Sequence, residues 1–350
     1  MAPVGAGRAL GRSMLPIGIA FAISLVLGFI VPSGTYFEKV LFDIGVNIVL
    51  AVSLNMVNGL TGQFSIGHAG FMAVGAYGSI VVTYYGGYAI WGDVMKHATL
   101  AGYSLYFVSI IVGGLAAAAA GYLVGLPSLR LRGDYLAIVT LGFGEIIRVL
   151  LQATPSTLYP SEMKDVPGWE RPLHLGGALG FSHGQSYNSL TWTFVAVAVT
   201  LLVAYRLRES THGRAFLSVR ENEIAAEAIG VNTTRYKVSA FVLAAFFAGV
   251  AGSLFAHQLG AGTASRPEEF NFMKSFDAVI MVVLGGMGSI SGATMAAIAL
   301  TLLTELLRSV QDYRLISYAL LLIVMMIVRP KGLFGTREIW HWFRKKGSAT

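Results

Sequence analysis

The chain has 350 residues, of which 55% are hydrophobic and 12% charged, and it contains no cysteine. Soluble domains are about 25% charged, so this composition predicts an integral membrane protein. The net charge of +7 does not indicate nucleic-acid binding, because the basic residues lie in loops beside apolar runs, as the positive-inside rule describes. The lack of cysteine excludes disulfides, thiolate metal sites and cysteine nucleophiles.

Apolar runs follow one another along the whole chain and predict an all-α, polytopic transmembrane bundle. They cover residues 15–31, 40–57, a stretch ending at Tyr84, and then 105–126, 135–151, 190–205, 238–259, 276–284, 293–307 and 316–328. We therefore expect about ten spans (8–10) in one transmembrane domain, residues 1–350, with both termini in the cytoplasm.

The connections between these runs predict which side of the membrane each one faces. Residues 154–189 carry charges that roughly cancel, which suits an outer loop. Residues 206–237 and the tail 329–350 are basic or strongly charged, and we place both in the cytoplasm.

Two Gly-rich segments, near Gly62–Gly70 and Gly285–Gly292, interrupt apolar runs. Irregular backbone at membrane depth is tolerated only where protein or a water-filled cavity covers it. Paired interruptions of this kind point to discontinuous helices around a midplane pathway. The candidate pathway residues are Asn55, Asn58, Gly62, Ser65, His68, Gly285, Gly286 and Gly288. The alternative stays open that the polar side chains among them hold helices together by hydrogen bonds or cap a broken helix.

No catalytic arrangement is evident, so we do not expect an enzyme. Gly285–Gly292 lacks the Gly-Lys-Ser/Thr ending of a phosphate-binding loop. The seven histidines are scattered without metal-ligand spacing. Glu145 and Arg148 are three residues apart, share one helix face and are expected to form a structural pair. We expect no metal and no cofactor bound by this chain.

The most polar segment between two apolar runs is Gly213–Lys237. Its apolar residues recur near helical spacing and Gly230 lies where a helix would stop, which predicts an amphipathic helix. Such a helix is either a surface on which another protein docks or a solvated helix that contacts nothing.

Four ordered motifs resemble the LivM-type permeases of branched-chain amino acid ABC importers. They are residues 130–148 (RLRGDYLAIVTLGFGEIIR), the segment from Gly213 to Gly230, residues 283–289 (VLGGMGS) and residues 329–333 (RPKGL). The resemblance runs from about residue 40 to the C-terminus and implies a multi-pass permease subunit of the bacterial inner membrane, in contact with lipid.

The resemblance also implies partners. These are a LivH-like second permease, two cytoplasmic ATPase subunits (LivG/LivF-like) that use ATP and Mg²⁺, and a periplasmic substrate-binding protein, with no nucleic acid. It implies that the cytoplasmic helix docks on an ATPase. The residues expected to couple to the ATPase are Arg214, Arg220, Glu221, Asn222, Glu223, Ala225, Glu227 and Gly230. Glu221, Glu223 and Glu227 are expected to offer their charge to the ATPase.

Two alternatives remain open at this point. The outer segments at Thr154 and residues 260–272 depart from the pattern of many relatives, so urea, an amide or an aromatic carboxylate stands as an alternative substrate. A stand-alone secondary transporter or channel is the alternative function. The small number of ionisable residues inside the predicted spans favours a permease driven by a partner.

Overall fold

The computed structural model describes residues 34–92, 99–128, 134–181, 187, 189–258 and 265–307, together with residues 316, 320, 323, 324, 327, 328 and 332. Over these residues the regular elements are helices, and an isolated β-bridge joins Phe181 to Ser265. The predicted span at 15–31 lies outside the described residues, as does the tail 329–350 apart from Gly332.

Five helices among the described residues are long and apolar enough to cross a membrane. They are α2 (Tyr36–Asn58), α5 (Leu100–Ser128), α6 (Asp134–Gln152), α7 (Leu190–Glu209) and α10 (Thr233–Gln258). A hydrocarbon core about 30 Å thick needs about 20 helical residues, and these helices meet that length within a turn. The structure therefore supports a multi-pass, all-helical membrane protein, while the count of ten spans stays a prediction.

Other helices are too short to cross alone. α3 (His68–Val81) continues into a π-helical turn, η1 (Val82–Gly86), and then α4 (Gly87–Trp91). α11 (Phe272–Gly285) has 14 residues, which corresponds to about 21 Å, and α12 (Ile290–Leu306) follows it. Irregular backbone lies before α3 and after α11.

Glycine lets the central helices approach one another closely. α3, α5 and α10 pack together, and a Cβ added to Gly75 of α3 would lie 2.2 Å from the Cα of Gly249 on α10. A Cβ on Gly113 of α5 would lie 2.6 Å from the carbonyl oxygen of Gly75. Close backbone contact through small residues is the usual way in which membrane helices associate. α2 lies beside this group and is largely buried, whereas α6 is mostly exposed.

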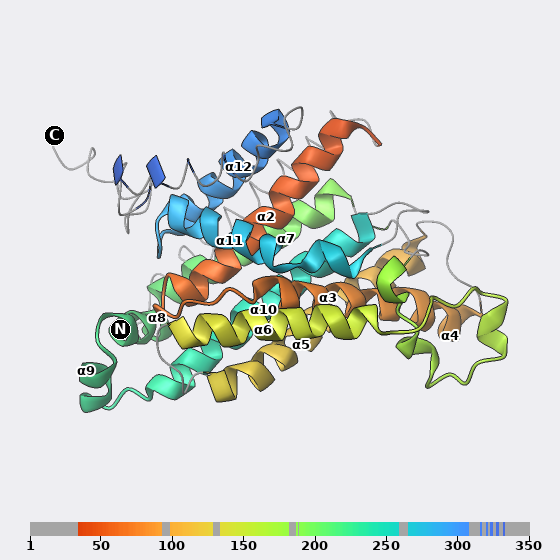
Figure 1. Ribbon diagram of the computed structural model, residues 1–350, viewed down its shortest axis with the longest axis horizontal. Helices are drawn as coiled ribbons and strands as arrows, with labels where there is room; N and C mark the ends of the chain where they lie inside the picture. The colour runs from red at the N-terminus through yellow and green to blue at the C-terminus, as the bar shows by residue number, and fades with distance from the viewer. Residues whose placement is uncertain are drawn as a thin grey trace, which may run out of the picture.

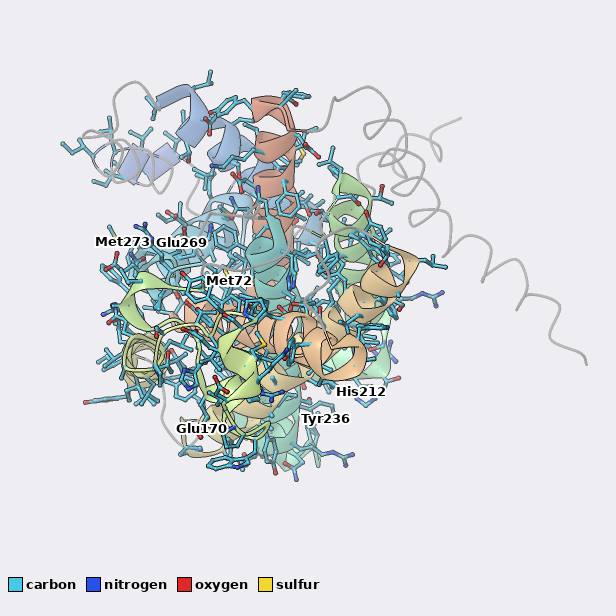
Figure 2. The ribbon with its side chains drawn as sticks, turned by 90° about the vertical axis from the view of Figure 1, so that its right-hand side faces the viewer. Met72, Glu170, His212, Tyr236, Glu269 and Met273 are labelled. Carbon is cyan, nitrogen blue, oxygen red and sulfur yellow. The ribbon has the colours of Figure 1, made fainter. Side chains whose placement is uncertain are left out.

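The two ends of the bundle differ in structure. α8 (Thr211–Glu221) and α9 (Glu223–Ala228) lie at one end, on the left in Figure 1. At the other end, residues 153–181 form a loop with three short 3-10 turns, η2 (Glu162–Lys164), η3 (Arg171–Leu173) and η4 (Gly177–Leu179). Figure 2 views the molecule from this loop end, with Glu170 labelled.

The loop is fixed to the helices beneath it. The hydroxyl of Tyr84 donates to the carbonyl of Leu158 at 2.9 Å, and that of Tyr85 donates to the carbonyl of His174 at 2.6 Å. Phe181 packs edge-on against Tyr84, and its bridge to Ser265 joins the loop to η5 (Pro267–Phe270). The loop is thus a folded cover over η1, between α3 and α4.

Candidate functional site: the helix pair and the two glycine-rich breaks

The polar segment between α7 and α10 folds as two helices. The backbone is extended at Asn222 (φ −161°), and its Oδ1 accepts a hydrogen bond from the N–H of Ala225 at 3.1 Å. Asn222 therefore ends α8 and caps the start of α9, because asparagine readily bonds nearby backbone groups. The predicted single amphipathic helix is wrong in this respect. Gly230 does follow the end of α9, with φ +88°, a conformation that glycine adopts without steric cost.

The cytoplasmic segment 206–237 stays a prediction, and both of its ends are helical in the structure. α7 continues to Glu209 and α10 begins at Thr233, so residues 210–232 connect them. The arginines at 206 and 208 lie in the last turn of α7, where positive charge favours the negative end of the helix dipole.

The two faces of the helix pair have opposite character. Phe216 and Val219 of α8 and Ala226 of α9 are buried. Ile224 and Ile229 are 72% and 77% exposed, which is unusual for isoleucine in a polar segment. The exposed residues of α9 and its flanks are called here the α9 surface. They are Glu221 at the end of α8, Ile224, Ala225, Glu227 and Ala228 of α9, and Ile229 just after it. This surface is an apolar strip with carboxylates beside it.

Glu223 does not belong to this surface. Its Oε1 lies 2.5 Å from the Nζ of Lys237 on α10, and the Lys237 side chain is 10% exposed. Glu227 accepts from the hydroxyl of Thr233 at 2.6 Å, although Glu227 remains exposed. Glu223 therefore holds α9 against α10, and the expectation that the three glutamates offer their charge to an ATPase stays a prediction. Glu221 is exposed.

The first break, residues 59–67, joins α2 to α3. Asn58 bonds the backbone of Ser65 in both directions, donating to its carbonyl at 3.4 Å and accepting from its N–H at 3.1 Å. The Nε2 of His68 lies 2.8 Å from the Oγ of Ser53 on α2. Asn58 and His68 are both buried and bond other groups of the protein, and their role in a pathway stays a prediction. Gly62 is exposed, with φ +71°.

The second break, residues 286–289, joins α11 to α12. Gly286 and Gly288 have φ +104° and +91°. Asn55 of α2 bonds both sides of the break, accepting from the N–H of Gly288 at 2.8 Å and donating to the carbonyl of Ser289 at 3.2 Å. The backbone of Gly332, in the last of the four motifs, also reaches this break: its added Cβ would lie 2.5 Å from the Cα of Gly286.

The end of α11 and the start of α12 approach each other at Gly285 and Gly292, without side chains between them. A Cβ added to Gly285 would lie 2.4 Å from the backbone carbon of Gly292. A larger residue at either position would push the two helices apart.

The two breaks are in direct contact. A Cβ added to Gly59 would lie 2.5 Å from the amide nitrogen of Gly288, and one added to Gly288 would lie 3.2 Å from the carbonyl oxygen of Gly59. Arg220, from the last turn of α8, points to the same place and donates from Nη1 to the carbonyl of Gly59 at 2.6 Å. Arg214 stays exposed, with its Nη2 3.4 Å from the hydroxyl of Thr211.

Glu145 and Arg148, which were expected to form a structural pair, make an ion pair in the structure. The Nε of Arg148 lies 2.7 Å from the Oε2 of Glu145 on α6. Glu145 also borders a narrow space between α6, the start of α3 and the start of α11. Within the described ranges, no three His, Asp or Glu side chains gather to hold a metal ion.

Comparison with known proteins identifies the family. Residues 36–329 match the family described as the permease component of the branched-chain amino acid transport system. The chain belongs to this family. It is 38% identical over 303 residues to the high-affinity branched-chain amino acid permease protein LivM of Salmonella typhimurium, covering 82% of this chain and 67% of the relative. LivM of Escherichia coli matches with the same identity and coverage.

A second kind of permease also matches. The chain is 31% identical over 177 residues to the permease protein LivH of Escherichia coli, covering 48% of this chain and 56% of the relative. These relatives do not favour urea, an amide or an aromatic carboxylate as the substrate. No solved structure matches the chain.

Sequence reasoning missed three contacts in this region. The preference of asparagine for helix N-caps was a usable signal for the division at Asn222. No sequence signal pairs Glu223 with Lys237 across 14 residues, or Arg220 with Gly59 across 161 residues, because those contacts depend on how the helices pack.

Proposed function

We propose that this chain is a permease subunit of an ATP-driven importer that carries a branched-chain amino acid across the bacterial inner membrane. In this proposal the chain is not an enzyme and binds no cofactor; two cytoplasmic ATPase subunits hydrolyse ATP with Mg²⁺. A periplasmic protein delivers the substrate. Membership of the family and the similarity to LivM support this assignment.

The observation that carries the proposal is the α9 surface. Two isoleucines that are 72% and 77% exposed lie at the end of the bundle opposite the folded loop (Figure 1). Exposed apolar strips with polar rims mark protein contacts. In the proposed complex, the ATPase covers Ile224 and Ile229, while Glu221 and Glu227 meet its charged rim.

A second permease completes the proposed pathway. This chain is similar both to LivM and to LivH. In the proposal a LivH-like permease is therefore the second subunit that pairs with it. Apolar residues of α6, including Ile138, Ile146 and Leu150, are more than half exposed and are available to that partner or to lipid. In the proposal, the discontinuous helices α3 and α11 flank the path, and the contact between the two breaks closes it at the ATPase end.

The docking step is tested by placing a charge in the α9 surface. Burying an isoleucine contributes about 1.5–3 kcal/mol, so I229D should lower the amount of ATPase that co-purifies with the permease about tenfold or more. L179D is the matched control, because Leu179 is 83% exposed at the opposite end. Equal ATPase recovery with both variants would refute the docking proposal.

Transport itself is tested in vesicles. Uptake of leucine should require the second permease, the ATPase subunits, the binding protein and ATP together. Gradient-driven uptake by the purified chain alone would instead establish the stand-alone transporter.

A further inference from the structure

Arg220 lies between the two breaks. Its Nη1 donates to the carbonyl of Gly59 at 2.6 Å. A Cβ on Gly288 would lie 2.8 Å from the same Nη1, and a Cβ on Gly62 would lie 3.0 Å from the Arg220 Cγ. Glycines on both breaks thus leave the room that this side chain occupies. Arg220, one of the residues expected to couple to the ATPase, points into the permease.

The charge of Arg220 suits this position. Gly59 is the C-cap of α2 and Gly286 is the C-cap of α11, and neither helix has a basic residue in its last turn. The C-terminal end of a helix carries partial negative charge, which a nearby cation stabilises. Arg220 therefore supplies, from a third helix, the positive charge that the ends of α2 and α11 lack.

The helix pair is fixed at the junction of α8 and α9, on either side of Asn222. Glu223, the first residue of α9, joins α9 to Lys237 of α10. Arg220, in the last turn of α8, joins α8 to the breaks. Asn55 of α2 bonds the second break, so the end of α2 and the end of α11 are held to each other and are expected to move together. A displacement of the α9 surface thus has a direct route to both breaks through the Arg220 side chain.

We infer that Arg220 is the positioning residue that couples movement of the α9 surface to the contact between the Gly59 and Gly288 breaks. This inference rests on the proposed function. When the ATPase moves the helix pair, Arg220 carries the ends of α2 and α11 with it. Without Arg220 the ATPase still docks, because the α9 surface is intact, but its movement no longer reaches the breaks.

The test measures ATP hydrolysed per substrate transported in vesicles that contain the complete complex. R220A should keep the ATPase bound but raise this ratio about tenfold, within the usual size of coupling between two sites. A residue that only stabilises the fold would lower the yield of active complex, and hydrolysis and uptake would fall together with an unchanged ratio. An unchanged ratio in R220A would overturn the inference.

Conservative and control variants complete the test. R220K keeps one charged donor for the Gly59 carbonyl but not the planar guanidinium, so its ratio should fall between those of the wild type and R220A. R235A removes an exposed arginine at the start of α10 and should keep the wild-type ratio. If R220A fails to assemble, R220K and R220Q are compared instead, and equal ratios in these two and the wild type would overturn the inference.

Different results would refute the proposed function and the role of Arg220. A wild-type complex without ATP-dependent uptake would refute the proposed function itself. A coupled wild-type complex in which the Arg220 variants stay equally coupled would refute only the role of Arg220.

Discussion

At the residue scale, charged side chains of the helix pair α8–α9 and its neighbours divide into those that hold the pair in place and those that are exposed. Glu223 and Lys237 form the clearest internal contact, with side chains 28% and 10% exposed. K237M would keep most of the apolar stem of Lys237 but remove this contact. Because the pair is partly exposed to solvent, its loss should cost about 1 kcal/mol or less.

This loss predicts a local change. Amide hydrogens of α9 should exchange up to about fivefold faster in K237M than in the wild type, since α9 opens more often. Hydrogen exchange followed by mass spectrometry of the peptide covering residues 222–232 measures it. E221Q changes an exposed carboxylate on the same segment and should leave the exchange rate unchanged; equal rates in all three proteins would show that the contact stabilises nothing.

The polar residues at the breaks could be picked out from the sequence, but their role could not. Asn55, Asn58 and His68 stand out because polar groups are rare in apolar runs. The sequence could not decide between a pathway role and a holding role, because the partners of Asn55 lie more than 230 residues away. Spacing rules reach only neighbours on one helix. In the structure all three bond other parts of the protein.

At the element scale, the long apolar helices could be predicted from hydropathy, whereas their packing could not. α2, α5, α6 and α7 each cover a predicted span, and α10 covers the span predicted at 238–259 up to Gln258. The short helices α3 and α11 begin and end at Gly-rich segments whose close contacts depend on the tertiary arrangement. The division between α8 and α9 escaped prediction because the apolar spacing continues across Asn222, so periodicity gave no boundary there.

The contact of α3 with α10 gives a prediction about elements. G75A would place a Cβ 2.2 Å from the Cα of Gly249, so the helices must separate. Overpacking of this kind costs about 1–3 kcal/mol or more, and the melting temperature in detergent should fall. G142A is the matched control on α6, because no atom lies within 4 Å of its added Cβ. A melting temperature as low in G142A as in G75A would contradict the packing argument.

At the scale of the whole molecule, the bundle has a helix pair at one end and a folded loop at the other (Figure 1). In the proposed function these ends face opposite sides of the membrane. Trp169 of the loop is 76% exposed, and Glu209 at the end of α7 is exposed beside the helix pair. Because the chain contains no cysteine, a single introduced cysteine reports the side on which it lies.

We expect W169C to react with a membrane-impermeant maleimide added to spheroplasts, and E209C to react only after the membrane is opened. A251C, at a position that is fully buried, should react in neither case and controls for non-specific labelling. This orientation follows from charge, because the arginines of α7 lie beside Glu209 and basic residues next to a span remain on the cytoplasmic side. Labelling of W169C and E209C from the same side would refute this orientation, and with it the placement of the α9 surface where an ATPase could reach it.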